Sequence, residues 1–499
     1  MSFWRRSLGR ALVMVIQAVF TRGIGIISSG LLARLLTPTD WGSMQAVIQA
    51  AGTMAQTLKL SVDTGLQIRL SETQRQPDES TPGELLGAAL LVLGLLSALA
   101  VVLGVFLSGV TARLFGEPAL EPFMGWTGWL AAGQLIAQIA GALFAFGAFR
   151  AGAFTQIGVN SCYLILLLVA YALNVRGLLL GLSTQLFLQL SIGLTYFALT
   201  VRAWRALSIK PTLKRFWTSE RELLRIGLPM HAAAAVPAVV SLFVSALLAR
   251  SSGLPALAEL RVVGAMNQLV AFLPQSMAVT YLTEFAGARG NEAQVSRHDF
   301  SRYIRIIIAS AILAATSGVW MSHWLVPLAF GDRYASAVKF VSIGVATALV
   351  NATKQSLLIG LMSERKTGYA LADSFVSSIL YAPLAVLLTP MLGVAGLLLG
   401  ELVSQLATLL MLGWVVSSRF RHADSARPAF KALSALVITI TALLLTYFVY
   451  DRANSWMAYV PVLIGLSLCV PWVLFTQGER TALVQMLRAR FRAGSSTPG

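Results

Sequence analysis

Three cationic side chains, Arg22, Lys59 and Lys354, lie deep inside apolar segments of this 499-residue chain. Charged groups in hydrocarbon are costly, so they usually face a polar interior or pair with another charge. A guanidinium can donate two parallel hydrogen bonds to a phosphate. Arg22, near the middle of its segment, therefore predicts a binding site for an anionic group such as phosphate. A structural pair between Arg22 and a carboxylate of a neighbouring helix is the alternative.

A polar stripe follows the second apolar segment. At about 100° per residue its members share one helix face with Gly52: Gln45, Gln49, Gln56, Lys59 and Asp63. Such a stripe predicts the lining of a substrate cavity. The alternative is that these side chains hydrogen-bond neighbouring helices together, and that Lys59 and Asp63, four residues apart, neutralise each other.

Other apolar segments also carry polar side chains that are candidates for the same cavity. They are Asn267, Gln268, Asn351, Lys354 and Gln355. Lys354 could instead extend its ammonium towards a membrane surface. The carboxyls that could bind a coupling ion are Asp63, Glu284, Asp373 and Glu401, the last with Gln405 one turn on. His231 lies between Pro229 and Pro237, and prolines kink helices; a locally satisfied histidine is its more ordinary role.

The elements that carry these residues are transmembrane helices. The chain is 57% hydrophobic and 12% charged, with a mean hydropathy of +0.74, whereas soluble domains are about 25% charged. Its apolar runs extend over about twenty residues, the length of a spanning helix; barrel strands are shorter and alternate in polarity. We predict an all-α integral membrane protein with these spans: 10–33, 42–66, 84–109, 125–149, 153–174, 178–201, 222–249, 259–284, 303–329, 336–361, 369–390, 392–416, 429–450 and 456–476.

The distribution of positive charge predicts the orientation. Of the 38 Lys and Arg residues, 27 fall on the side of the N-terminus and 8 on the other side. Cytoplasmic loops carry the excess of Lys and Arg, so both termini are expected in the cytoplasm of a bacterial inner membrane. The net charge of +17 is then spread over many short loops, which excludes a nucleic-acid surface. The first segment is expected to be a retained helix, since Arg22 interrupts it.

The loops and cysteines argue against an enzyme. The longest loop, about 202–221, has no room for a catalytic domain. Cys162 and Cys469 both lie within apolar runs and have no metal-site spacing. We therefore expect no catalytic residue, metal or cofactor.

An internal repeat suggests two lobes. The first span ends in Gly30-Leu-Leu-Ala-Arg34 and the seventh in Ala246-Leu-Leu-Ala-Arg250, both on the outer side. Six spans separate these positions, so the repeat is parallel, with its axis along the membrane normal and a cavity between the lobes. The expected organisation is an N-terminal lobe at 1–201, a basic linker at 202–221, a C-terminal lobe at 222–416, two extra helices at 429–476 and a basic tail at 477–499.

Several short stretches resemble the polysaccharide and O-antigen-unit flippase family of the multidrug/oligosaccharidyl-lipid/polysaccharide (MOP) exporter superfamily. The first is Ala33-Arg-Leu-Leu-Thr-Pro-Thr-Asp40-Trp-Gly42. The others, in chain order, are Leu60–Leu70, Ile226-Gly-Leu-Pro229, Phe330-Gly-Asp-Arg-Tyr334 and Gly393-Val-Ala-Gly396. The resemblance covers the whole chain. Thr21-Arg22-Gly23 is also similar to the first-helix arginine of lipid II flippases, but Gly23 replaces the acidic residue usual there.

The resemblance implies a two-lobed fold that works by alternating access. It implies a substrate that is an oligosaccharide linked to undecaprenyl pyrophosphate, moved from the cytoplasmic to the periplasmic leaflet for an exopolysaccharide, capsule or O-antigen. Membrane lipids, a polysaccharide polymerase and its co-polymerase are the candidate partners. The alternatives are a multidrug or organic-cation antiporter, which would need acidic cavity residues, and a membrane glycosyltransferase or polymerase, which would need a large outer loop.

Overall fold

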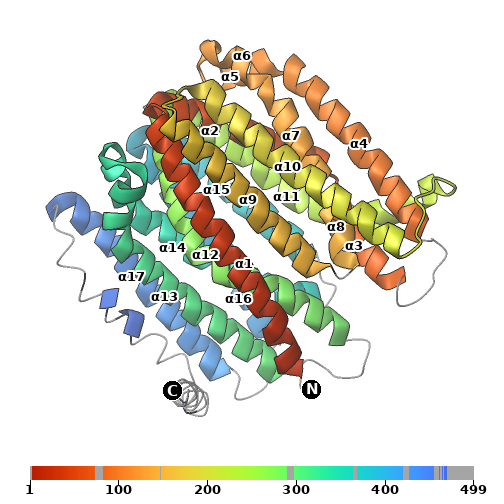
Figure 1. Cartoon of the computed structure of the whole chain (residues 1–499). Helices are drawn as coiled ribbons and strands as arrows, with labels where there is room; N and C mark the ends of the chain where they lie inside the picture. Colours follow the sequence, from red (N-terminus) through yellow and green to blue (C-terminus); the bar gives the residue numbers. More distant parts are fainter. Residues whose placement is uncertain are drawn as a thin grey trace, which may run out of the picture.

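The computed structural model describes residues 3–73, 82–146, 148–288, 297–363, 368–419 and 426–453, with residues 460, 463–464, 466–468 and 481. Within these ranges all regular structure is helical, and long helices run side by side through one bundle (Figure 1). The all-α prediction is therefore confirmed.

The first half of the chain forms ten α-helices and one short 3-10 helix. Their bounds are α1 Phe3–Leu35, α2 Pro38–Leu58, α3 Val62–Thr73, α4 Pro82–Phe106, α5 Ser108–Leu114, η1 Pro118–Leu120, α6 Glu121–Met124, α7 Trp126–Ala137, α8 Ala140–Ala145, α9 Phe149–Ala172 and α10 Leu178–Ala206. The second half has the following helices: α11 Phe216–Ser252, α12 Leu254–Ala288, α13 Arg297–Phe330, η2 Asp332–Ala337, α14 Val338–Ser363, α15 Gly368–Leu392, α16 Val394–Arg419 and α17 Ala426–Ala453.

Thirteen of the fourteen predicted spans correspond to helices of the described residues. Among those residues, nine helices are long and apolar enough to cross a membrane by length and composition, and the protein is a multi-pass membrane protein. The predicted span 456–476 and the basic tail 477–499 lie almost entirely outside the described residues. Helix α10 extends to Ala206 and α11 begins at Phe216, so both ends of the predicted linker 202–221 are helical.

Two predicted spans are not continuous helices, which corrects the prediction. The span 42–66 breaks after Leu58, and Leu60 and Ser61 adopt positive φ angles of 51° and 48° before α3 begins. The span 125–149 is interrupted between α7 and α8. Helices α3 and α8 pack on each other, and a Cβ on Gly141 of α8 would lie 2.4 Å from the Asp63 carbonyl oxygen. The two breaks are therefore neighbours in the bundle.

One end of the bundle has very short connections between long helices. Leu36 and Thr37 join α1 to α2, and Gly253 alone joins α11 to α12. Gly253 has a φ of 79°, a conformation that suits glycine because it has no Cβ. Thr37 caps α2, since its Oγ1 accepts a hydrogen bond from the Asp40 N–H at 3.1 Å. We call this end, with the Gly331 turn after α13, the tight end.

The helices pack in the same order in both halves. In the first half α4 packs on α7, α7 on α10 and α9 on α10; in the second, α13 packs on α14, α14 on α16 and α15 on α16. Between the halves, α1 contacts α12 and α13, while α11 contacts α2 and α4. This is the arrangement that a parallel internal repeat produces, and it places α1, α2, α11 and α12 along the boundary between the halves.

Candidate functional site

The boundary between the halves is held in its middle by polar contacts of α2 with α11. Gln49 donates a hydrogen bond from Nε2 to the Ser241 hydroxyl at 3.0 Å. Thr53 donates from its hydroxyl to the Ala238 carbonyl oxygen at 3.1 Å. The α2 stripe thus includes one side chain, Gln49, that joins helices as the alternative interpretation expected. We call this boundary of α2 with α11 the polar seam.

Open space lies beside the same face of α2. A Cβ added to Gly52 would meet nothing within 4 Å, and from Asp40 to Leu58 no residue of α2 is fully exposed. Gly52 is itself partly buried, on a helix that packs against α7, α11 and α12. Gln45 and Gln56 share this face and are half-buried. Their amides are available to a polar ligand in the space.

Helix α11 contributes a feature that the sequence reasoning missed. Every residue from Met230 to Leu242 is partly buried, and none is fully buried or exposed. Four consecutive alanines, Ala232 to Ala235, lie in this stretch, and their short side chains leave room around the helix. The alanine run between His231 and Pro237 could have indicated a helix with small side chains at the seam.

The cationic side chain of Lys59 lies where the polar seam meets the break after α2. Lys59 is the C-cap residue of α2, and it is close enough to His231 of α11 to act on that residue electrostatically. Gly227 brings α11 near, since its Cβ would lie 2.7 Å from the Leu60 carbonyl oxygen. Asp63 is in the first turn of α3, so it does not continue the straight stripe of α2.

Arg22 lies on the inner face of α1. It is partly buried and shares a face with Ile26 and Ala33, which are buried, whereas Phe20 and Ile27 on other faces are exposed. Near it, Gln17 donates a hydrogen bond to Gln156 of α9 at 2.5 Å. Because α1 also packs on α12 of the second half, Arg22 belongs to the helix that borders the boundary.

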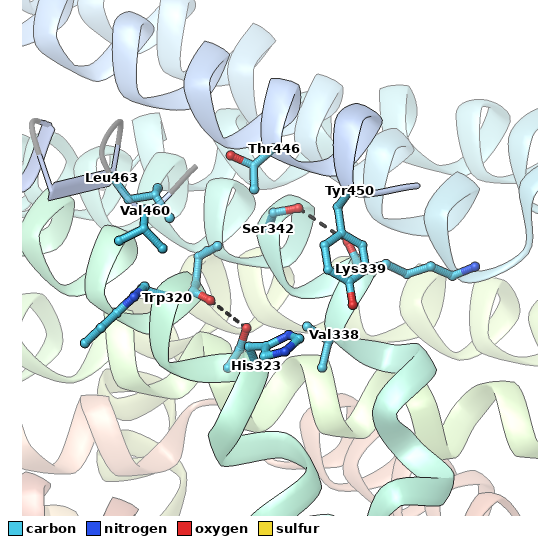
Figure 2. A pocket seen from close by; sticks show the side chains of 11 residues that line it. Trp320, His323, Val338, Lys339, Ser342, Thr446, Tyr450, Val460 and Leu463 are labelled. Carbon is cyan, nitrogen blue, oxygen red and sulfur yellow. Dashed lines mark hydrogen bonds between the residues drawn. The ribbon is translucent and has the colours of Figure 1, made fainter. Parts of the chain in front are cut away.

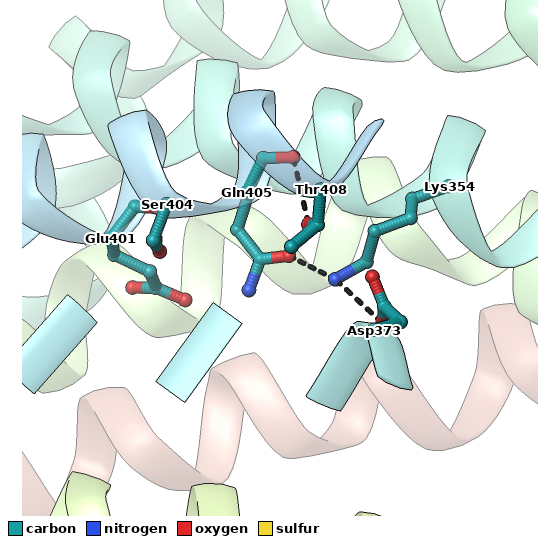
Figure 3. A network of polar contacts seen from close by, with 6 residues as sticks. All are labelled: Lys354, Asp373, Glu401, Ser404, Gln405 and Thr408. Atoms are coloured by element: carbon teal, nitrogen blue, oxygen red, sulfur yellow. Dashed lines mark hydrogen bonds and ion pairs between the residues drawn. The ribbon is translucent and has the colours of Figure 1, made fainter. Parts of the chain in front are cut away.

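Lys354 belongs to a separate, buried cluster in the second half (Figure 3). Its ammonium on α14 forms an ion pair with Asp373 of α15 at 3.1 Å and a hydrogen bond with the Gln405 amide oxygen of α16. Lys354 and Asp373 are 5% and 4% exposed, so the ammonium does not reach a membrane surface. The Thr408 hydroxyl donates to the Gln405 carbonyl oxygen at 3.1 Å and rigidifies that turn.

The cluster has more negative than positive groups. Glu401 is one turn before Gln405 on α16, and Figure 3 shows it further from the Lys354–Asp373 pair. Asp373 Oδ1 is buried and has no hydrogen-bond partner among the described residues. Asn351 and Gln355 of α14 are only partly buried. Of the coupling-ion candidates, Asp373 is thus paired with Lys354, Glu401 lies on the neighbouring α16, and Asp63 lies in the other half.

The remaining candidates on α12 are in different surroundings. Asn267 packs against α14, because a Cβ on Gly344 would lie 2.9 Å from its Oδ1. Gln268 is exposed. The side chain of Glu284 lies outside the described residues. The structure therefore does not gather all eleven predicted cavity residues in one place.

A small pocket of about 40 Å³ lies away from the seam, between α13, α14 and α17 near the tight end (Figure 2). Its wall includes Trp320, His323, Ser342, Thr446 and Tyr450. Ser342 hydrogen-bonds the Lys339 carbonyl oxygen at 3.4 Å. Tyr450 lies in the last turn of α17, and tyrosines near helix ends are typical of membrane–water interfaces.

Comparison with known proteins identifies structures that share this fold. No family model matches the sequence, and no curated protein matches it. Among solved structures, an inward-facing multidrug resistance MATE family transporter of the MOP superfamily has a TM-score of 0.66 at 13% identity, covering 83% of this chain and 100% of its own.

Two further structures are similar. The lipid II flippase MurJ, in an inward closed conformation, has a TM-score of 0.64 at 13% identity and covers 95% of this chain and 100% of its own. A mutant of the Vibrio cholerae MATE transporter VcmN has a TM-score of 0.60 at 14% identity, covering 85% and 98%. The chain therefore has the fold of MOP-superfamily transporters and flippases.

Proposed function

We propose that this protein moves an oligosaccharide linked to undecaprenyl pyrophosphate across a bacterial inner membrane by alternating access. The observation that carries the proposal is Arg22, a half-buried guanidinium on the inner face of the helix that borders both halves. A guanidinium there suits the diphosphate of such a lipid, because it can donate two parallel hydrogen bonds to phosphate oxygens. Lys59, beside the seam, adds a second cation.

The physical problem is the headgroup. An ionised group buried in an apolar medium without partners costs tens of kcal/mol, and each unpaired sugar hydroxyl adds about 2–7 kcal/mol. The half-buried amides of Gln45 and Gln56 beside the open space at Gly52 offer substitute hydrogen bonds for sugars. The polyprenyl tail would stay in lipid while the headgroup passes between the halves.

The tight end is assigned to the periplasm in this proposal, with both termini in the cytoplasm. The charge distribution of the loops supports that assignment. The lobe boundaries at 1–201 and 222–416, the two extra helices and the basic tail are part of the same proposal. A polymerase and co-polymerase would act on the delivered repeat unit.

The second candidate is an antiporter for organic cations, because MATE transporters are among the similar structures. Such a substrate would be attracted by carboxylates and repelled by Arg22 and Lys59. The cations along the boundary therefore favour the flippase.

The test is a deletion strain in which lipid-linked glycans of the cytoplasmic leaflet are extracted and identified. Accumulation of an undecaprenyl-pyrophosphate oligosaccharide that wild type relieves is the expected result. Arg22→Gln should fail to relieve it, Arg22→Lys should relieve it in part, and Arg176→Gln, which alters an exposed arginine bonded to Asn174, should behave as wild type. No accumulation, together with new sensitivity to cationic drugs, would replace the flippase with the antiporter.

A further inference from the structure

The repeated pentads at the ends of α1 and α11 have equivalent contacts at the tight end. Arg34, at the end of α1, donates from Nη2 to the Leu328 carbonyl oxygen at 2.5 Å and from Nε to the Ala329 carbonyl oxygen at 3.3 Å. Arg250, in the last turn of α11, donates from Nη2 to the Arg113 carbonyl oxygen at 2.5 Å. Each arginine therefore reaches across the boundary between the halves.

The acceptors are equivalent as well. Leu328 and Ala329 are in the last turn of α13, and Arg113 is in the last turn of α5, directly after α4. Helices α4 and α13 occupy the same position in the packing order of their halves. The last carbonyl groups of a helix lack intrahelical partners and carry the negative end of its dipole. Each guanidinium thus caps the end of a helix that belongs to the other half.

Apolar contacts close the same region. Trp41 of α2 stacks on Phe330 of α13 with ring centroids 5.9 Å apart and meets Tyr334 edge-on at 5.0 Å. The backbones also approach closely, because a Cβ on Gly30 would lie 2.4 Å from the Ala329 carbonyl oxygen. The Arg34 contact lies at the edge of this closed surface.

We propose that Arg34 and Arg250 are paired latches that hold the tight end shut, and that both must release before that end can open. The inference rests on the alternating-access cycle of the proposed function. Because the two guanidinium caps join the same two halves, loss of either cap weakens the closed state at both positions. Two purely local helix caps would instead loosen only their own surroundings.

The experiment measures how often the tight end opens. Ser43 of α2 and Ser245 of α11 are buried near this end, 4% and 7% exposed, and each is replaced in turn by cysteine in a Cys162→Ser, Cys469→Ser background. The labelling rate of each reporter by a membrane-impermeant maleimide is measured in nanodiscs. Since a buried thiol reacts only when exposed by opening, its rate follows the open fraction.

Arg34→Gln and Arg250→Gln are each expected to raise the labelling rate of both reporters about tenfold, and the double variant about a hundredfold, from the loss of charged hydrogen bonds. Arg34→Lys and Arg250→Lys, which keep the charge but not the fork, should give smaller increases. Arg176→Gln, whose partner Asn174 is in the same half, should leave both rates unchanged.

The latch proposal would be overturned if acceleration were confined to the reporter in the same half as the altered arginine, Ser43 for Arg34 and Ser245 for Arg250. It would also be overturned if neither reporter were labelled faster. Labelling needs no substrate, so this result is independent of the glycan assay. If labelling accelerates but no glycan accumulates in the deletion strain, the latches stand and the flippase function is wrong. If glycan accumulates but labelling does not accelerate, the flippase function stands and the latches are wrong.

Discussion

The buried pair of Lys354 and Asp373 predicts a large and non-additive effect on stability. Lys354→Met leaves the Asp373 carboxylate buried at 4% exposure without its ion-pair partner at 3.1 Å. Removing one member of a buried pair costs about 3–5 kcal/mol, because the remaining charge stays desolvated and uncompensated. Asp373→Leu should cost a similar amount for the same reason. The double variant removes both charges, and replacing both ions by apolar groups is often close to neutral.

Thermal unfolding in detergent micelles, followed by size-exclusion chromatography, measures these differences. Both single variants should unfold at clearly lower temperature than wild type, and the double variant should recover most of the loss. Lys339→Met is the matched control, since this lysine is also on α14 but lies over the Phe340 ring, 4.9 Å from its centroid. If the single variants match that control, or if their losses simply add in the double variant, the ion pair does not stabilise the cluster as argued.

Three further predictions use the same unfolding assay. Gly42→Ala should destabilise, because its Cβ would lie 2.0 Å from the Leu254 carbonyl oxygen, whereas Gly52→Ala on the same helix has no neighbour within 4 Å and should be neutral or stabilise by up to about 1 kcal/mol. Thr37→Ala should lower stability by about 1 kcal/mol through loss of the α2 cap; an unchanged unfolding temperature would contradict it. Burial raises the pKa of Glu220, which precedes the membrane segment of α11 beginning at Met230. Ionisation of Glu220 therefore lowers the stability of the folded protein, fully so above this raised pKa. Glu220→Gln should stabilise the protein at neutral pH, and the gain should vanish as the pH falls below the ordinary glutamate pKa of about 4.3, which applies to the unfolded chain. A gain that persists in acid would refute this.

The hydropathy pattern predicted the helices well but not their interruptions. Thirteen spans correspond to helices because burial in lipid demands long apolar runs. The break at Lys59-Leu60-Ser61 has no glycine or proline of its own. Its position coincides with close approaches of distant glycines, Gly227 to Leu60 and Gly141 to Asp63. Such contacts arise between helices and are invisible in a local window.

The candidate site was predictable as a set of residue types but not as a set of contacts. Lys354, Asp373 and Gln405 all stood out as polar residues in apolar runs, yet three separate helices bring them together. The reach of Arg34 to the end of α13 spans almost three hundred residues of chain. The repeated pentad could be recognised in the sequence, whereas the contacts of its arginines depend on how the two halves pack.

The reciprocal arginine contacts bear on the origin of the chain. In a symmetric homodimer the interface is isologous, so a residue of one subunit contacts a site on its partner and the partner returns the same contact. Arg34 reaching the end of α13, and Arg250 reaching the end of the α4–α5 segment, follow that rule within a single polypeptide. Two copies of a six-span ancestor, fused end to end in the same orientation, would leave this record. If the chain is divided in the connection at 207–215 and the two halves are expressed separately, they should then assemble with each other through the same contacts.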